Sequence, residues 1–348
     1  MAMKYSIGYQ LPDEYDSIAE IVQDYREHIS SVYFSPPGAV SARSVIPEDE
    51  AADMIRELRF IREQGVSLTM LFNANCYGDG AVSSGFRQGV VDTVGRMLDQ
   101  LDISDVTTTS PFVARVIKQA FPGIRVCASV NMWIGTIQAM EYLGDDFNGY
   151  YIQREYNRNF SRIRQLHDWC QTHGKELRLL ANSGCLYMCP FHTFHDNLVA
   201  HEGGASRLDN AYSDQPSPCW DMMYRLPDAQ AAAVFLQESW IRPEDIVHYE
   251  PYFSEIKLAT RMHSNPRRVV AAYARGRFRG NMMDLTEPSY SRRFSRHILD
   301  ASRVPADWFE RTADCSKDCD RCGYCAEAAK AMLVSKAELE SMYLGSSW

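Results

Sequence analysis

Short apolar runs rich in β-branched residues alternate with longer amphipathic runs along most of this 348-residue chain. Runs of the first kind predict buried strands, and runs of the second kind predict helices. The predicted strands are residues 5–10, 31–35, 67–73, 105–109, 125–131, 149–154, 177–182 and 255–260. The predicted helices are residues 15–28, 47–63, 86–101, 111–120, 136–143, 159–172 and 266–277.

Eight strands with interleaved helices predict an α/β fold, a TIM-like (β/α)8 barrel. A doubly wound sheet is the alternative architecture. No G-x-G-x-x-G or P-loop pattern follows a predicted strand, so neither of these nucleotide sites is expected. We expect residues 1–284 to form the barrel, with a long insertion after strand 7 at about 184–246. Residues 285–348 are expected to form a C-terminal extension. Loops that follow barrel strands lie on the catalytic face, which gives the insertion functional interest.

The C-terminal extension carries four cysteines in the spacing C-x3-C-x2-C-x2-C, namely Cys315, Cys319, Cys322 and Cys325. Four thiolates this close can surround one ion or one cluster. Disulfides are disfavoured because a chain of this length does not need them and its start shows no secretory signal. The closely spaced C-x2-C steps favour an iron–sulfur cluster, and zinc is the alternative.

A second cysteine group follows the seventh predicted strand. Cys185 and Cys189 come directly after that strand, and Cys219 lies further along the insertion. Three thiolates at a barrel mouth leave a fourth coordination position. Cys76, His192 or His195 could fill it, or it could stay open for a substrate. Cys127 and Cys170 lie inside a predicted strand and a predicted helix, so we expect both in the core.

Polar side chains stand at the ends of several predicted strands. We expect Arg154, Lys257 and Glu155 to be catalytic. We expect a set of neighbouring groups to bind substrate: Asn73, Asn131, Arg261 and Glu250. Cationic groups at strand ends suit a carboxylate ligand, and asparagines can orient it. The alternative for each residue is an ion pair or a hydrogen bond at the barrel rim.

The formal net charge of −9 does not favour broad nucleic-acid binding. Residues 261–303 nevertheless carry ten arginines and no lysine. A solvated helix face with ion pairs is the favoured interpretation, and a site for a polyanion or a multicarboxylate is the alternative. No apolar run approaches the ~20 residues that a membrane span needs. We therefore expect a cytoplasmic protein without a membrane partner.

Several motifs together resemble the collagenase-like (PrtC-type, U-class) peptidase family, which includes the UbiU/UbiV-like iron–sulfur barrel proteins. They are residues 182–189, Pro218-Cys219-Trp220, Gln153-Arg154-Glu155, the strand Ile256-Lys257-Leu258-Ala259-Thr260-Arg261, and the helix start Pro266-Arg267-Arg268-Val269-Val270. The resemblance spans roughly residues 5–280 in order. The family's first two cysteines are further apart than the pair here, its fourth cysteine has no clear match, and the tail motif is not a common family feature.

The resemblance implies a [4Fe–4S] cluster at Cys185, Cys189 and Cys219. The departures from the family's pattern suggest a specialised branch with a second cluster at the tail cysteines. The resemblance also implies oxygen-independent hydroxylation, with prephenate as oxygen donor in characterised branches. We therefore expect an iron–sulfur oxidoreductase that acts on a small anionic substrate and takes electrons from a donor protein. The resemblance also allows a heterodimer with a related barrel protein.

Two other functions remain open at the level of the sequence. The first is an RNA-modifying hydroxylase of the same family, although RNA is the less favoured partner given the acidic charge. The second is a peptidase or other hydrolase. The chain has no H-E-x-x-H motif of a zinc peptidase and no G-x-S-x-G motif of a serine hydrolase. The remaining hydrolytic arrangement is a cysteine nucleophile with His192 or His195 as its base.

Overall fold

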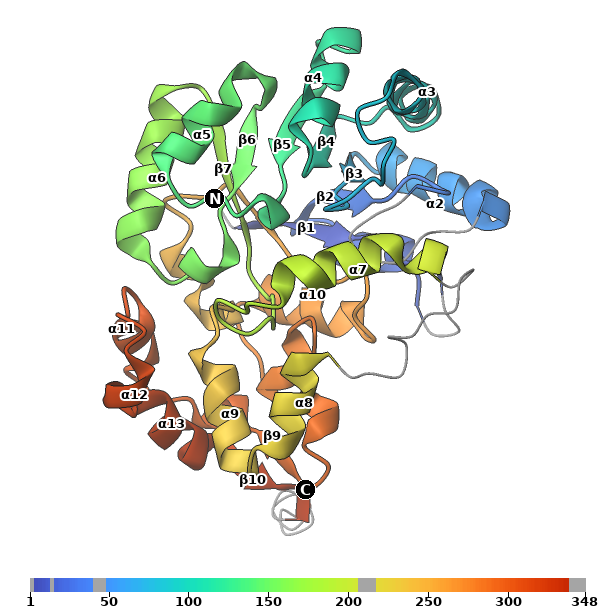
Figure 1. Ribbon diagram of the computed structural model, residues 1–348. Coiled ribbons are helices and arrows are strands. Elements are labelled where there is room, and N and C mark those ends of the chain that lie inside the picture. The colour runs from blue at the N-terminus through green and yellow to red at the C-terminus, as the bar shows by residue number, and fades with distance from the viewer. Residues whose placement is uncertain (1–2, 13–15, 40–47, 206–216, 338–348) are drawn as a thin grey trace.

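The computed structural model describes residues 3–12, 16–39, 48–205 and 217–337 (Figure 1). Two predicted helix starts, Tyr15 and Pro47, lie outside these residues, as do residues 206–216 of the insertion and 338–348 of the tail. The side chains of residues 202–205, at the end of a described helix, are also outside the description.

Eight parallel strands close into a barrel in chain order, which confirms the predicted fold. The strands are β1 (Lys4–Gly8), β2 (Ile29–Phe34), β3 (Ser67–Phe72), β4 (Asp105–Thr108), β5 (Arg125–Ala128), β6 (Gly149–Tyr151), β7 (Glu176–Leu180) and β8 (Glu255–Lys257). The last strand pairs with the first, with Ile256 opposite Tyr5, and this closes the ring. Several strands end earlier than predicted because the residues after them turn into the polar loops of the barrel mouth.

Helices cover the outside of the barrel, as a parallel sheet requires. They are α1 (Ile18–Asp24), α2 (Ala51–Glu63), α3 (Ser84–Leu101), α4 (Pro111–Ala120), α5 (Ile137–Leu143), α6 (Phe160–Thr172) and α10 (Pro266–Arg275). Local sequence sets their ends. Ser17 and Glu20 form a capping box at α1, and Gly276 adopts a positive φ where α10 stops.

The insertion and the tail fold together beside the barrel (Figure 1). The insertion contributes α7 (His192–Ala205), α8 (Pro218–Arg225) and α9 (Asp228–Gln237). The tail contributes α11 (Trp308–Thr312), α12 (Cys319–Cys322) and α13 (Tyr324–Met332), with the strand pair β9 (His297–Leu299) and β10 (Leu333–Ser335). Buried side chains of α8, α9 and the tail form a second hydrophobic core, in which Phe235 and Leu236 pack with Ala329 and Met332. The insertion and the tail therefore share one core.

One buried asparagine joins the barrel to the tail. Asn182, directly after β7, is fully buried and donates to the carbonyls of Ala259 (3.1 Å) and Leu285 (2.8 Å). Its side-chain oxygen accepts from the Ala259 N–H at 2.6 Å. The Glu287 N–H also donates to the Asn182 carbonyl, and the Gly184 N–H donates to the Glu287 carbonyl. The segment after β7 therefore lies between the end of β8 and the tail.

Gly184 makes this close approach possible. A Cβ atom at this position would lie 2.2 Å from the carbonyl oxygen of Pro288, a distance that no side chain can tolerate. Within the described residues, no helix is both long enough and apolar enough to cross a membrane.

We predict that Asn182→Ala lowers the free energy of unfolding by about 2–3 kcal/mol, because it leaves buried backbone groups of Ala259 and Leu285 without partners. Urea unfolding followed by circular dichroism measures the change. Gln230→Ala is the matched control, since Gln230 is an exposed amide on α9 and its loss should stay within about 0.5 kcal/mol of the parent. Equal effects of the two substitutions would contradict the role given to Asn182.

Candidate active site at the mouth of the barrel

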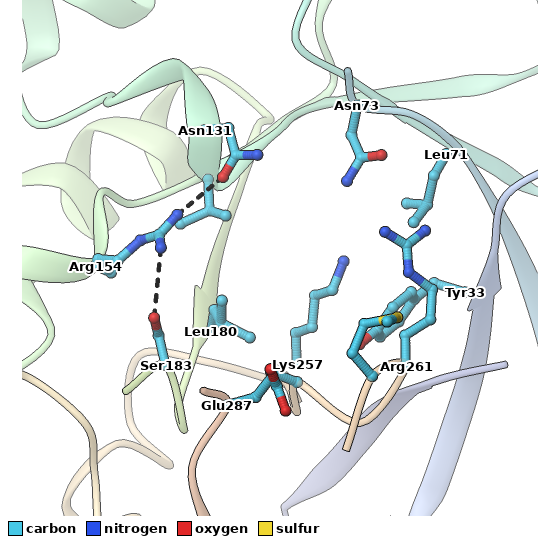
Figure 2. A pocket seen from close by; sticks show the side chains of 13 residues that line it. Tyr33, Leu71, Asn73, Asn131, Arg154, Leu180, Ser183, Lys257, Arg261 and Glu287 are labelled. Carbon is cyan, nitrogen blue, oxygen red and sulfur yellow. Dashed lines mark hydrogen bonds between the residues drawn. The ribbon is translucent and has the colours of Figure 1, made fainter. Parts of the chain in front are cut away.

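A small cationic cavity of about 80 Å³ lies at the carboxyl ends of the strands (Figure 2). The side chains that line it come from segments that follow different strands. They include Tyr33, Asn73, Asn131, Arg154, Ser183, Lys257, Arg261 and Glu287. The structure thus brings together five residues predicted from the sequence: Asn73, Asn131, Arg154, Lys257 and Arg261. Two guanidinium groups and one amine around so small a space suit a carboxylate ligand.

Lys257 ends β8 and points into the cavity. Its Nζ lies 3.7 Å from the centre of the Tyr33 ring and 5.3 Å from that of Tyr151. In the part of the chain that the structure describes, this nitrogen has no hydrogen-bond or ion-pair partner. Burial, together with the positive charge of Arg261, lowers the pKa of Lys257 to about 7. A lysine of this pKa can exist as amine or ammonium near neutral pH, so it can act as acid or base.

Arg154 has two neighbours in the cavity and one outside it. It begins the 3₁₀ turn Arg154–Tyr156 after β6 and is 6% exposed. Its Nη2 donates to Asn131 Oδ1 at 2.8 Å, and its Nη1 lies 3.4 Å from Ser183 Oγ (Figure 2). The same Nη1 donates to the sulfur of Cys185 at 3.2 Å. One guanidinium group therefore contacts both the anion cavity and the first cysteine of the insertion.

A second, larger cavity of about 490 Å³ lies next to the first and shares Met262 and Glu287 with it. The three cysteines of the insertion, Cys185, Cys189 and Cys219, all line this cavity. His192 and His195 line it as well. The structure thus brings together the thiols that lie 34 residues apart in sequence, and two of the three proposed candidates for a fourth ligand.

The thiols of this second cavity are partly buried and close to one another. Burial raises the pKa of Cys189 and of Cys219. The Cys185 thiol adds to both shifts, because a neighbouring negative charge disfavours the thiolate. Burial and the Cys219 thiol likewise raise the pKa of Tyr290, which lines the same cavity. A bound cation would reverse these shifts by neutralising the thiolates.

The donor set fits an iron–sulfur cluster or another thiophilic metal, since soft thiolates select such groups. As the side chains stand, no three His, Cys, Asp or Glu residues among those described lie close enough together to hold a single ion. A multi-atom cluster spans a wider separation of sulfurs than one ion does.

Three of the residues predicted at the barrel mouth line neither cavity. Glu250 is exposed and lies beside Met3 and His28, at the amino ends of the strands; its prediction at the barrel mouth is wrong because it precedes β8 rather than following it. Glu155 is 5% exposed and its side chain contacts Gln153, outside the cavity lining; burial raises its pKa. Cys76 accepts from the Gly78 N–H in the loop after β3, and is absent from the lining of the thiol cavity.

Sequence reasoning missed Tyr33, Ser183 and Glu287. Tyr33 and Ser183 lie at the ends of β2 and β7, so strand-end position was a usable signal. Tyr33 also donates to the Leu258 carbonyl at 2.8 Å. Glu287 had no such signal, because it reaches the cavity through the tail segment that pairs with residues 182–184.

Several arginines of the 261–303 segment are engaged in ion pairs. Arg267 pairs with Asp16 and Asp24, Arg268 with Asp284, and Arg293 with Asp228. These pairs support the ion-pair interpretation for this part of the segment. Arg261 differs, since it lines the anion cavity and its Nη1 donates to Ser35 Oγ.

Comparison with known proteins supports the resemblance seen in the sequence. A curated protein of Methanocaldococcus jannaschii, named Uncharacterized protease MJ1657, is 22% identical over 333 residues, covering 93% of this chain and 95% of the relative. A solved structure described as the U32 peptidase Mk0906 has the same fold, with a TM-score of 0.53 and 15% identity over 74% of this chain and 92% of that one. No family model matches the chain. The resemblance to the collagenase-like U-class peptidases is thereby confirmed, together with the barrel fold.

We predict that carboxylate binding in the cavity weakens as the pH rises through about 7, because the ammonium form of Lys257 attracts the anion and the amine does not. Malonate titrated calorimetrically should bind up to about tenfold more weakly at pH 8 than at pH 6, the ratio expected for one group of this pKa. Lys257→Met should remove the dependence. Lys330→Met, which alters an exposed lysine paired with Glu327, should retain it. A pH-independent affinity in the parent protein would contradict this role.

Proposed function

We propose that this protein is an iron–sulfur oxidoreductase that acts on a small organic carboxylate at the mouth of its barrel. Within this class, oxygen-independent hydroxylation is the reaction that we favour. The observation that carries the proposal is the position of Arg154, whose guanidinium group contacts Asn131 in the anion cavity and the sulfur of Cys185 in the thiol cavity. An anion held by this guanidinium lies next to any group that the cysteines hold.

Cys185, Cys189 and Cys219 would hold the cluster, with His192 or His195 as a fourth ligand or with one position left open. Such a cluster supplies a one-electron donor and, at an open iron position, a Lewis acid. Arg154 and Arg261 would bind the substrate carboxylate through paired N–H donors.

The remaining residues of the anion cavity would orient the substrate and move protons. Asn73 and Asn131 offer amide groups to oxygen atoms of the substrate. Lys257, between two aromatic rings and with a pKa of about 7, would take up or release a proton at the reacting carbon. In the hydroxylation that we favour, a C–H bond of the substrate is replaced by C–OH. The hydroxyl group comes from an organic hydroxy acid such as prephenate, which accepts the hydrogen in exchange.

A hydrolase is the second candidate, supported by the peptidase names of the relatives and by one observation in this chain. His192 and His195 line the same cavity as Cys189, so a cysteine nucleophile with a histidine base is available there. His192 already pairs with Asp196 at 3.2 Å and contacts the Trp133 ring edge-on. Peptide hydrolysis by metal-free protein that iodoacetamide abolishes would favour this function over the oxidoreductase.

The proposed function predicts iron and sulfide in protein purified without oxygen. The Cys185→Ser/Cys189→Ser variant should lose about four irons and four sulfides per chain relative to the parent, with the visible absorption that dithionite bleaches. The matched control is Cys170→Ala, which removes a buried thiol of α6 that lines neither cavity and should keep the full iron content. A parent protein that contains zinc and no iron would overturn the proposal.

Arg154 gives a second test that does not depend on knowing the substrate. A cation beside a cluster stabilises its more negative, reduced form. Arg154→Gln should therefore lower the midpoint potential of the barrel cluster by on the order of tens of millivolts. Arg164→Gln, which removes an exposed arginine of α6, should leave the potential unchanged. An unchanged midpoint potential in Arg154→Gln would contradict the proposed position of Arg154 beside the cluster.

A further inference from the structure

The four cysteines of the tail form a group of their own, away from both cavities. Cys315 precedes α12, Cys319 and Cys322 begin and end its single turn, and Cys325 lies in the first turn of α13. Cys315, Cys319 and Cys325 are partly buried, and Cys322 is exposed. Burial raises the pKa of Cys319, and the thiols of Cys315 and Cys322 add to the shift. Burial raises the pKa of Cys325 to about 11, and the thiols of Cys319 and Cys315 again contribute. The Cys319 thiol therefore lies within electrostatic reach of each of the other three, and Cys315 within reach of Cys325.

The backbone on either side of this group is fixed to the rest of the fold. The Asp314 N–H donates to the carbonyl of Arg158 at 2.7 Å, and Asp314 Oδ1 accepts from the Ser161 N–H at the start of α6. On the other side, Ala328 and Ala329 of α13 are buried in the core shared with α9. Cys315 and Cys325 thus stand at two anchored ends of one short loop.

The guanidinium group of Arg158 is buried next to the cysteine loop of the tail. It is buried between the rings of Trp240 and Trp308, at 4.9 and 5.1 Å from their centres. It donates to the Trp240 carbonyl at 2.6 Å, and to the Leu236 carbonyl at 3.3 Å. The Cys325 sulfur lies 3.9 Å from that same Leu236 carbonyl. A positive charge held next to Cys325 favours a site that carries net negative charge, as a thiolate-bound cluster does.

One layer of side chains separates the tail thiols from the barrel thiols. Lys317, between Cys315 and Cys319, extends toward the barrel, and its Nζ lies 4.5 Å from the centre of the Tyr187 ring. Tyr187 stands in the loop between Cys185 and Cys189. Lys317 Nζ also donates to the carbonyls of Gln237 and Glu238 at the end of α9. The tail loop is therefore attached directly to the loop that carries the barrel cysteines.

Glu238 is a second side chain between the tail thiols and the barrel thiols. Its side chain is 2% exposed, and one carboxyl oxygen has no hydrogen-bond partner. Burial raises the pKa of Glu238 well above its usual range; the Lys317 ammonium opposes this shift, and the Cys185 thiol adds to it. This carboxyl group thus lies near Cys185 of the barrel group and near Lys317 of the tail loop. Natural proteins seldom bury a carboxyl without full hydrogen bonding unless it has a functional role.

We propose that Cys315, Cys319, Cys322 and Cys325 bind a second iron–sulfur cluster, which exchanges single electrons with the barrel site across Tyr187 and Glu238. This deepens the proposed function and rests on it for the destination of the electrons. Each transfer oxidises a reduced one-electron carrier protein by one electron and reduces the barrel cluster by one electron, so the tail undergoes no net change. The reduced barrel cluster is then ready for the exchange of hydroxyl and hydrogen, which itself consumes no electrons. The close C-x3-C-x2-C-x2-C spacing of the motif suits a cluster better than it suits a zinc ribbon, which pairs two C-x2-C knuckles across a longer loop.

The test compares full-length variants purified without oxygen. The parent should contain about eight irons and eight sulfides per chain, and Cys319→Ser/Cys322→Ser about half as many. After reduction with dithionite, the parent should show an electron paramagnetic resonance spectrum broadened by coupling between two neighbouring clusters. The tail variant should show the uncoupled spectrum of the barrel cluster alone. Cys170→Ala should match the parent in both measurements.

The reciprocal variant separates failure of this proposal from failure of the proposed function. Cys185→Ser/Cys189→Ser should keep the tail cluster and lose the barrel cluster. If that variant alone loses iron, the barrel site stands and the tail site is overturned. One zinc per chain that the tail variant loses would also overturn the tail cluster. If the double tail variant does not fold, Cys322→Ser replaces it, since this thiol is exposed and its loss removes no core contact.

Discussion

The hydrogen bonds of Asn182 fix the point from which the whole site is built. This side chain joins the end of β7 to the end of β8 and to the tail at Leu285. A buried amide with three such bonds is costly to break, because each partner would be left without water or protein to replace it. The barrel alone would leave the segment after β7 as a free loop. The tail holds it in place, and so Ser183 and Cys185 enter their two cavities from a fixed backbone.

Arg154 gives this fixed backbone a chemical function, because its guanidinium group contacts both cavities. Its hydrogen-bond partners in the described structure are an amide oxygen, a hydroxyl group and a sulfur, and none of them is a carboxylate. A buried guanidinium group without a carboxylate hydrogen-bonded to it attracts an anionic ligand or an anionic cofactor. Lys257 also points into the cavity, and Arg261 is a third cation in the lining. These three cations outnumber the one carboxyl group of the lining, that of Glu287, which gives the mouth of the barrel its preference for a carboxylate.

The sequence predicted those parts of the fold and site that depend on local pattern. Each strand was recognised because its apolar run is short and bounded by polar residues. Asn131, Arg154 and Lys257 were placed correctly because residues at the carboxyl end of parallel strands share one face. Glu250 was misplaced by the same reasoning applied to the wrong end of a strand. Glu287 was beyond prediction, since its position depends on a pairing between segments about a hundred residues apart. The joint core of insertion and tail was beyond prediction for the same reason.

The second core also links the tail to the barrel mouth through consecutive contacts. Lys317 donates to the carbonyl of Glu238, and the next residue, Ser239, donates to the carbonyl of Glu155 at 3.2 Å. Glu155 adjoins Arg154 in the same 3₁₀ turn. Because metal binding in a short cysteine loop stabilises the folded form of that loop, a metal at Cys315–Cys325 would stabilise the backbone that positions Arg154. The extension and the catalytic face would then respond together to the metal, although they lie at opposite ends of the sequence.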